Sequence, residues 1–324
     1  MRPTIARMLA AALCGFPLAL HAQAQAQAYP NKSVRIVAPF PAGGSADVIP
    51  RIIGEKLSLK WGQPVIVENR AGAAGNIGAE YVFKAEPDGY TLLSSPPPPL
   101  IINPNLYRNL PFDPAQFVPV GVMVAIPNVV LVNPTVPVNS IRELIDYAKA
   151  NPDKLNYASQ GSGTTSHLTG EMFKSMAGVR LTHIPYKGSA PALTDLLAGQ
   201  VEMMFDNLGV SRQHVVSGKL KLLAVCSEKR VASLPDVPAL AEILPGFEAV
   251  AWFGIVAPPK TPMPIAERIS AAVAEVLKLP DVQKRLADLS AEAIGNTPAQ
   301  MAAFMKKDAE RWKGVIRSAG VKAD

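Results

Sequence analysis

The chain has 324 residues, of which 48% are hydrophobic, and this is enough apolar material for two packed lobes. Its formal net charge is +6, from 32 basic and 26 acidic residues. Because the Lys and Arg residues neither cluster nor alternate with aromatic residues, the composition argues against a nucleic-acid partner. A weakly basic chain is compatible with small acidic ligands.

The N-terminal segment has the layout of a secretory signal. Arg2 and Arg7 precede an apolar run, and Ala-x-Ala steps follow it up to Ala28. We therefore assign residues 1–28 to a signal peptide and expect a periplasmic protein. Cys14 would leave with this signal, so that the remaining Cys226 is expected to be a buried thiol without a disulfide partner. No later segment has the length of apolar sequence that a membrane span needs.

Strand and helix patterns alternate along the chain. In the first series, strands at 34–40, 64–70 and 90–95 alternate with helices at 52–59 and 78–85. A second series has a helix at 140–150, opened by a capping box of Ser140 and Glu143, and strands at 128–133, 155–159, 182–186, 201–205 and 220–227. The alternation predicts an α/β fold with two lobes, each a mostly parallel sheet flanked by helices.

The last third of the chain adds a strand at 250–258 and two helices, 264–279 and 298–319, the second opened by Thr297 and Gln300. Because no third sheet is available, these elements should return to the first lobe. We predict domain 1 at 29–126 and 254–324 and domain 2 at 127–253, joined by two hinge crossings. Hinged lobes close around ligands.

The stretch VRIVAPFPAGGSAD runs from an apolar strand into a Gly-Gly turn that opens a helix. Such a turn presents main-chain amides to an anion, and Asp47 should cap the helix, with Pro50 in its first turn. The alternative is a tight connection without a ligand. The candidate residues of this first loop are Phe40, Ala42, Gly43, Gly44, Ser45 and Asp47.

The stretch LNYASQGSGTTSHL repeats the design. No Lys follows its second Gly, so a nucleotide site would lack its central cation. The alternative is an ordinary N-capped helix. Two amide-lined loops predict a clamp without a catalytic side chain. The candidate residues of this second loop are Gly161, Ser162, Gly163, Thr164, Thr165 and His167.

Further candidates follow other strands. Ser95 and Pro96 begin SSPPPP, which predicts a stiff extended loop forming either an apolar cleft wall or a rigid surface connection. Tyr186 is a candidate hydrogen-bond partner of a ligand oxygen, or else a packed rim aromatic. Asp206 is placed to orient a ligand amine or a water, or else to satisfy turn amides.

Catalytic and metal sites are not indicated. Ser166 and His167 are adjacent on a predicted helix, point in different directions and lack a G-x-S-x-G elbow, so a serine hydrolase is the weakest alternative. His183 and His214 have no metal-site spacing. We expect no enzyme, no cofactor and no metal.

Many motifs in order, among them YPNKSVRIVAPFPAGGSAD, VIVENRAGAAGNIGAE, SQGSGTTSHLTGEMF, HIPYKGSAPALTDLLAGQVEMMFDN and WFGIVAP, make the chain resemble the Bug family from Tyr29 to Val321. These are the TctC-type periplasmic solute-binding receptors of tripartite tricarboxylate transporters. The resemblance implies two lobes closing over a small carboxylate, held by 40–47 and 161–167 partly through waters, with Asp206 facing the cleft. It also implies delivery to membrane permease subunits, and we expect a monomer.

The prolines at 96–99 depart from the small polar residues usual in this family. We therefore expect a flatter, more apolar ligand than citrate, such as an aromatic mono- or dicarboxylate. A receptor that presents its closed form to a membrane kinase would share the same ligand and differ only in its partner.

Overall fold

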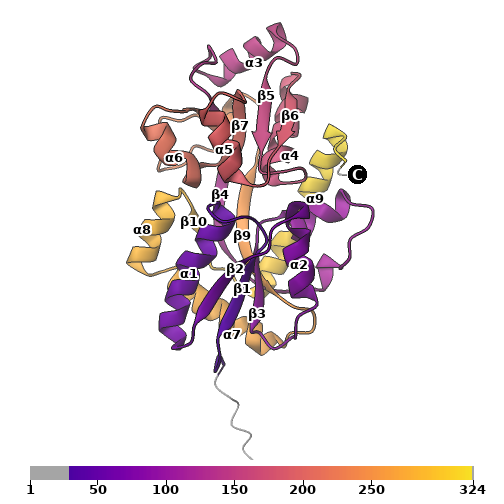
Figure 1. The fold of residues 1–324 in the computed structure, drawn as a ribbon, viewed down its shortest axis with the longest axis vertical. Coiled ribbons are helices and arrows are strands. Elements are labelled where there is room, and N and C mark those ends of the chain that lie inside the picture. The colour runs from indigo at the N-terminus through magenta and orange to yellow at the C-terminus, as the bar shows by residue number, and fades with distance from the viewer. Residues whose placement is uncertain (1–28, 323–324) are drawn as a thin grey trace, which may run out of the picture.

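The structure is a computed structural model that describes residues 29–322. These residues form two lobes stacked along the long axis of the molecule (Figure 1). The predicted signal peptide at 1–28, with Cys14 inside it, lies outside the described residues. Between residues 29 and 322, no helix combines the length and the apolar character needed to cross a membrane.

The first lobe, the lower one in Figure 1, unites the first three strands of the chain with its C-terminal helices. Its strands follow the order β2-β1-β3-β9, and the short β10 lies off this path. The elements are β1 (Val34–Ala38), α1 (Ser45–Trp61), β2 (Val65–Asn69), α2 (Asn76–Phe83), β3 (Thr91–Ser95), β9 (Val250–Ala257), α7 (Met263–Val276), α8 (Pro280–Asp288), β10 (Glu292–Ala293) and α9 (Pro298–Ala319).

The second lobe is continuous in sequence and has the strand order β7-β5-β6. Its elements are α3 (Ile141–Ala150), β5 (Asn156–Ser159), α4 (Thr165–Ala177), β6 (Thr182–Pro185), α5 (Ser189–Leu197), β7 (Met203–Asn207), α6 (Leu208–Val216) and β8 (Lys221–Val225).

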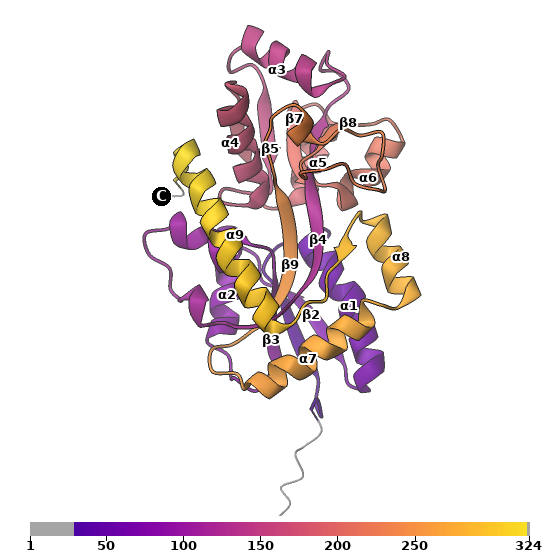
Figure 2. The same ribbon diagram turned by 180° about the vertical axis from the view of Figure 1, so that it is seen from behind.

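One long strand, β4 (Val118–Val132), belongs to both lobes (Figure 2). Its residues 118–127 pair antiparallel with β9, and its residues 128–132 pair antiparallel with β7. The change of partner falls at Asn128, whose amide donates to Ala249 O at 3.0 Å and whose carbonyl accepts from Cys226 N at 2.7 Å. The sheets are therefore mixed: pairings are parallel among β2, β1 and β3 and among β7, β5 and β6, and antiparallel around β4 and β9.

Neighbouring side chains of β1 pack against helices on opposite faces of the first sheet. Ile36 packs into one apolar core with Ile49 of α1 and Ile269 of α7, whereas the next residue, Val37, packs into another with Ala79 of α2. Successive side chains of a strand point to opposite faces, so a strand buried on both sides has a continuous apolar sequence.

Cys226 is a free, buried cysteine, as predicted.

Local capping signals place several helices correctly. Thr297 Oγ1 accepts from Gln300 N at 3.3 Å and Gln300 Oε1 accepts from Thr297 N at 2.9 Å, which completes the predicted capping box of α9. At α3, Ser140 caps Glu143 N, but the Glu143 carboxylate accepts from the amide of Asn139 instead of Ser140.

Two proline predictions are wrong. α1 begins at Ser45, so Pro50 lies beyond its first turn and removes one internal hydrogen bond. Residues 96–99 are buried but do not form an extended loop, because Pro98–Ile102 is a turn of π-helix in which Asn103 N donates to Pro98 O. Leu100 N and Ile101 N both donate to Pro97 O at its start. Prolines are tolerated at a helix start, where a main-chain N–H has no partner anyway.

Candidate functional site: a cavity at four helix starts

A small cavity of about 20 Å³, which is room for about one water molecule, lies where the two lobes meet, so the described conformation is nearly closed. It receives residues from the carboxyl ends of β1, β3, β5 and β7, which is where α/β sheets bind small molecules. Both predicted loops contribute to it. The lining residues are Phe40, Pro41, Gly44, Ser45, Ala46, Pro96, Pro98, Gln160, Thr164, Thr165, Gly188, Ser189, Asn207 and Phe253.

Four helices begin at this cavity. Gly44 is the N-cap of α1, Thr164 of α4, Gly188 of α5 and Asn207 of α6. The first amides of a helix have no partner within it, and the helix dipole places partial positive charge there. The cavity is therefore electropositive, although no Lys or Arg belongs to its lining.

The first loop uses part of its hydrogen-bonding capacity internally. The Asp47 carboxylate accepts from Gly43 N at 3.1 Å, Arg51 Nε at 2.8 Å and Asn69 Nδ2 at 2.8 Å. These hydrogen bonds lower the pKa of Asp47 against the opposing effect of burial, which is the largest single influence. Asp47 thus reaches back from inside α1 to hold the turn, and it does not line the cavity.

Hydrogen-bond donors of the first loop that have no partner among residues 29–322 lie at the start of α1. Neither Ser45 N nor Ala46 N bonds another residue in the described part of the chain, and Ser45 Oγ is buried without a hydrogen-bond partner there. Ala42 and Gly43 are exposed and lie outside the lining. Of the predicted residues in this loop, Phe40, Gly44 and Ser45 are the ones that the structure brings to the cavity.

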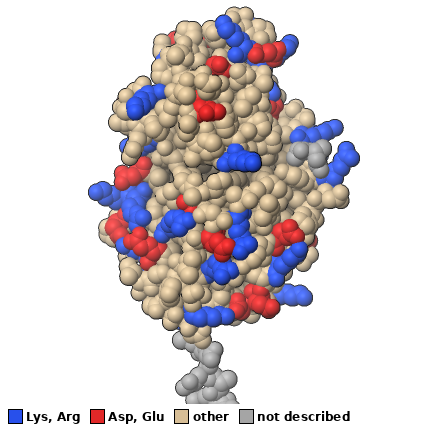
Figure 3. Space-filling model, in the orientation of Figure 1, with Lys and Arg blue, Asp and Glu red and all other residues tan. Residues whose placement is uncertain are grey.

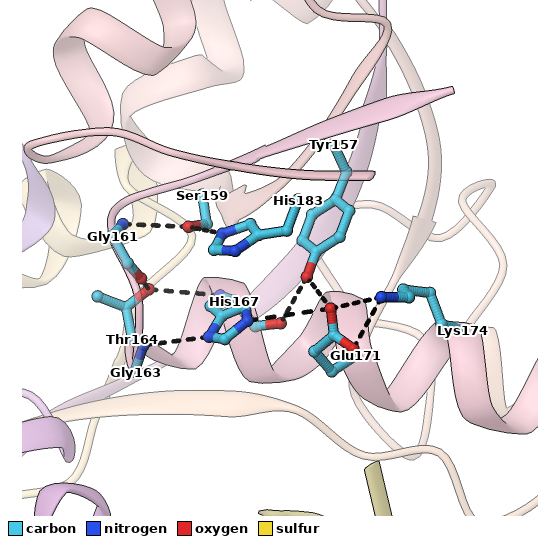
Figure 4. Close-up of polar contacts among 9 residues, drawn as sticks. All are labelled: Tyr157, Ser159, Gly161, Gly163, Thr164, His167, Glu171, Lys174 and His183. Atoms are coloured by element: carbon cyan, nitrogen blue, oxygen red, sulfur yellow. Dashed lines mark hydrogen bonds and ion pairs between the residues drawn. The ribbon is translucent and has the colours of Figure 1, made fainter. Parts of the chain in front are cut away.

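The second loop is held by a stacked pair of histidines (Figure 4). His167 and His183 have ring centroids 4.0 Å apart, and Tyr157 stacks on His183 at 4.9 Å. His167 Nδ1 accepts from Gly163 N at 3.1 Å, and Ser159 Oγ contacts both His183 Nε2, at 2.6 Å, and Gly161 N, at 3.1 Å.

Both imidazoles are held in the neutral form. Burial lowers the pKa of His167 to about 4, and burial together with the neighbouring His167 lowers that of His183 to about 3. Glu171 Oε1 lies 3.9 Å from His167 Nε2 and accepts from the Tyr157 hydroxyl at 2.6 Å, while Lys174 pairs with the same carboxylate (Figure 4). His167 is therefore a support of the loop and not part of the cavity lining.

Of the second loop, Thr164 and Thr165 reach the cavity, whereas Gly161, Ser162 and Gly163 do not belong to its lining. Thr164 Oγ1 donates to Gly161 O at 2.7 Å and accepts from His167 N, so the hydroxyl is used in capping. The amides of Thr165 and Ser166 make no hydrogen bond to another residue between 29 and 322.

Three further candidates lie outside the lining. Tyr186 OH donates to Asp195 Oδ2 at 2.7 Å, and its pKa is raised to about 12 by burial and this contact. Ser95 Oγ donates to Pro96 O at 2.8 Å. Asp206 is fully buried directly behind the cavity, where it contacts the lining residues Gln160, Ser189 and Asn207.

Sequence reasoning missed Gln160, Pro98, Phe253 and the start of α5 at Gly188 and Ser189. A signal was present, because Gly188 follows the strand THIPY and precedes a helical pattern, as Gly44 and Thr164 do after their strands. Phe253 carries no such signal, since only the return of β9 to the first lobe brings it here.

The hydrolase alternative has no geometry to support it. Ser166 Oγ donates to the carbonyl of Phe205, and His167 Nδ1 is occupied by Gly163 N. Within residues 29–322, no group of His, Cys, Asp and Glu has the arrangement of a metal site. Charges of both signs are scattered over the face shown in Figure 3, without a single basic patch.

Comparison with known proteins identifies the family of this chain. The model of the family described as tripartite tricarboxylate transporter family receptor matches residues 49–321. BugT of Bordetella pertussis is 37% identical over 93% of this chain and 93% of its own length.

Two solved structures have nearly the same fold. An R. palustris protein with adipate has 38% identity and a TM-score of 0.88, covering 91% of this chain and 99% of its own. MatC from Rhodopseudomonas palustris, with bound malate, has 32% identity and a TM-score of 0.84, covering 89% and 100%. The chain belongs to the tripartite tricarboxylate transporter receptor family, the Bug or TctC-type periplasmic solute-binding proteins.

Proposed function

We propose that this protein captures a small carboxylate in the cavity between its lobes and delivers it to the membrane permease subunits of a tripartite transporter. It acts by binding alone, as a monomer, after export directed by residues 1–28. The adipate and malate bound to its structural relatives support the carboxylate class. The observation that carries the proposal is the convergence of four helix starts on one cavity.

The energetics suit reversible capture. Micromolar affinity corresponds to about −8 kcal/mol. Each helix start contributes about 0.3 to 1 kcal/mol toward an anion, and each hydrogen bond to a charged group about 1.5 to 3 kcal/mol. A few such contacts reach micromolar affinity after the costs of association, so that an Arg clamp is not needed and the cargo can be released to a permease.

The cavity walls favour an apolar ligand body. Phe40, Pro96, Pro98 and Phe253 surround the helix starts, and the prolines offer no main-chain donors. A flat or extended apolar acid, such as an aromatic monocarboxylate, fits such walls better than citrate, whose three carboxylates would require more donors.

Calorimetric titration tests this proposal. We expect micromolar binding of at least one acid from a panel of benzoate, terephthalate, adipate, malate and citrate, with citrate weakest. The proposal fails if none of these acids binds, and the argument from the walls fails if citrate alone binds tightly.

A further inference from the structure

Asp206 is a carboxylate that lies behind the cavity and hydrogen-bonds to three of its lining residues. Its Oδ1 atom accepts from Gln160 Nε2, from Ser189 Oγ at 3.2 Å and from Asn207 N at 2.7 Å. Its Oδ2 atom is buried and has no hydrogen-bond partner in the described chain. Asp206 does not line the cavity itself, but it holds the N–H and O–H donors of Gln160, Ser189 and Asn207 pointed away from the cavity.

The consequence is a patch of acceptors on the cavity wall. The Gln160 amide group directs its Nε2 atom at Asp206 Oδ1 and, at 3.5 Å, at Asn207 Oδ1. Its carbonyl oxygen has no hydrogen-bond partner between residues 29 and 322 and is available as an acceptor. Ser189 gives its only hydroxyl proton to Asp206, so its oxygen can only accept from a ligand. Both residues line the cavity.

The orientation of the Gln160 amide is locked by a chain of hydrogen bonds that runs in one direction. Asn207 Nδ2 donates to Asn128 Oδ1 at 2.8 Å, and Asn128 Nδ2 donates to Thr169 Oγ1 at 2.7 Å. Thr169 Oγ1 in turn donates to Thr165 O at 2.6 Å. A rotated Gln160 would place its oxygen against two acceptors, Asp206 and Asn207 Oδ1, and would lose both bonds.

Two neighbouring parts of the cavity wall, one on α1 and one at Gln160 and Ser189, thus offer different hydrogen-bonding groups. Ser45 N, Ala46 N and Ser45 Oγ offer donors to an anion. The side-chain oxygens of Gln160 and Ser189 offer acceptors and lie in front of a buried carboxylate, which disfavours a second anion against these two atoms. Four helix starts with partial positive charge disfavour a cation. An uncharged donor satisfies all three conditions.

We propose that the Gln160–Ser189 patch selects a ligand bearing, besides its carboxylate, an uncharged hydrogen-bond donor such as a hydroxyl or a primary amide. The inference rests on the proposed function and names the substrate class of the same cavity. Asp206 is a positioning residue in it, since it acts through Gln160 and Ser189.

Matched acids that differ at one end test the inference by calorimetry. The probes are terephthalate and adipate, the monoamide of each, and the corresponding acids with an aminomethyl or amine end. We expect the monoamide to bind at least about tenfold more tightly than the diacid and than the amine. Equal affinities, or a tighter diacid or amine, overturn the inference while leaving carboxylate capture intact. If no member of this set binds, the inference fails, and the five acids of the first panel decide separately whether the proposed function fails as well.

Two variants separate the acceptor from the charge. Gln160→Met removes the acceptor at similar size, so the preference should fall because the monoamide binds more weakly. Asp206→Asn keeps an acceptor oxygen and removes only the charge, so the preference should fall because the diacid binds more tightly. Asp195→Asn, on α5 and outside the lining, is the matched control and should change neither affinity. An unchanged preference in folded Gln160→Met and Asp206→Asn proteins contradicts the inference.

Discussion

Gly44 shows how close the two lobes approach at the scale of a single residue. A Cβ atom built there lies 3.8 Å from Ser189 Oγ, across the cavity on α5. The residue has φ −89° and ψ 171°, which any amino acid adopts, so the left-handed turn belongs to Gly43, at φ 90°. Neither the backbone conformation nor a close contact at Cβ therefore requires glycine at position 44, and only a side chain larger than one methyl group meets Ser189.

Gly44→Val should weaken carboxylate binding by about tenfold, because a branched side chain between α1 and Ser189 overpacks a site that has room for one methyl group. Gly44→Ala is the control and should bind nearly as wild type, since its Cβ makes an ordinary contact. Calorimetry gives the affinities and thermal melting checks the fold. Normal binding by the valine variant would mean that the lobes do not close onto α1.

The histidine pair makes stability depend on pH. Because the pKa of His167 is lowered to about 4 and that of His183 to about 3, the folded protein binds fewer protons than the unfolded chain, whose histidines titrate near 6.5. The stability contribution is present above about pH 6.5 and is lost as the pH falls toward 4.

We therefore expect the melting temperature to fall between pH 6.5 and pH 4, and to fall less in His183→Phe, which keeps the stack without the titration. The buried Asp206, whose pKa burial raises to about 6, acts in the opposite sense, since its cost appears as the pH rises through that range. It is common to both proteins, so it cancels in the comparison. If the melting temperatures of the two proteins fall equally between pH 6.5 and pH 4, the histidine pair is not the cause of the pH dependence.

At the scale of elements, α9 is fastened to β9 by one buried carboxylate. Asp308 accepts from Trp252 Nε1 at 2.8 Å and pairs with Arg311, which also donates to Glu248 O at 2.7 Å. Asp308 is 6% exposed and Trp252 is 1% exposed. The hydrogen bond between the indole and the carboxylate is therefore buried in the folded protein.

Asp308→Ala should lower the free energy of unfolding by about 1 to 3 kcal/mol, because it leaves the indole N–H of Trp252 buried and unsatisfied. Asp308→Asn keeps an acceptor and should lose less than the alanine variant. Denaturant unfolding followed by tryptophan fluorescence measures both. Equal losses would show that the ion pair with Arg311, and not the indole contact, is what matters.

The elements that the sequence predicts best are those with local signals. α9 runs from Pro298 to Ala319 as predicted, because a capping box and a proline define its start. The turn after β3 was missed, because four prolines are equally compatible with an extended loop and with a helix start. No local sequence pattern predicts that β4 changes its partner strand at Asn128, because both halves of β4 are buried and have similar apolar sequences.

The site was predictable to a similar degree. The loops at Gly44 and Thr164 follow from Gly turns after apolar strands, and both line the cavity. The internal use of Gly43 N by Asp47 depends on side-chain geometry that spacing does not determine. Gln160 becomes notable only once Asp206 is known to lie behind it, across 46 residues of sequence.

At the scale of the whole molecule, the described conformation has its lobes in contact across the cavity. Besides Gly44 and Ser189, a Cβ atom built at Gly188 lies 3.3 Å from Pro41. The chain passes between the lobes in β4 and near Ala249, where hydrogen bonds join both crossings. Two adjacent crossings permit bending, so an open form without ligand is expected.

A double variant, Gly44→Cys with Ser189→Cys, should form a disulfide between the lobes, because the two side chains meet in the closed form. A bound carboxylate should speed its formation under mild oxidation, followed by mobility on non-reducing gels. The single variants serve as controls, and Cys226 is buried and should not react. A rate that does not respond to any bound acid would indicate a rigid pocket.

The separation of main-chain donors from side-chain walls in this cavity has an evolutionary consequence. Amides at the starts of α1, α4 and α5 persist through almost any substitution, whereas Pro96, Pro98 and Phe253 can each be exchanged by a single mutation. Duplicated copies of such a gene can therefore drift to new cargo shapes without passing through a form that has lost its hold on acids.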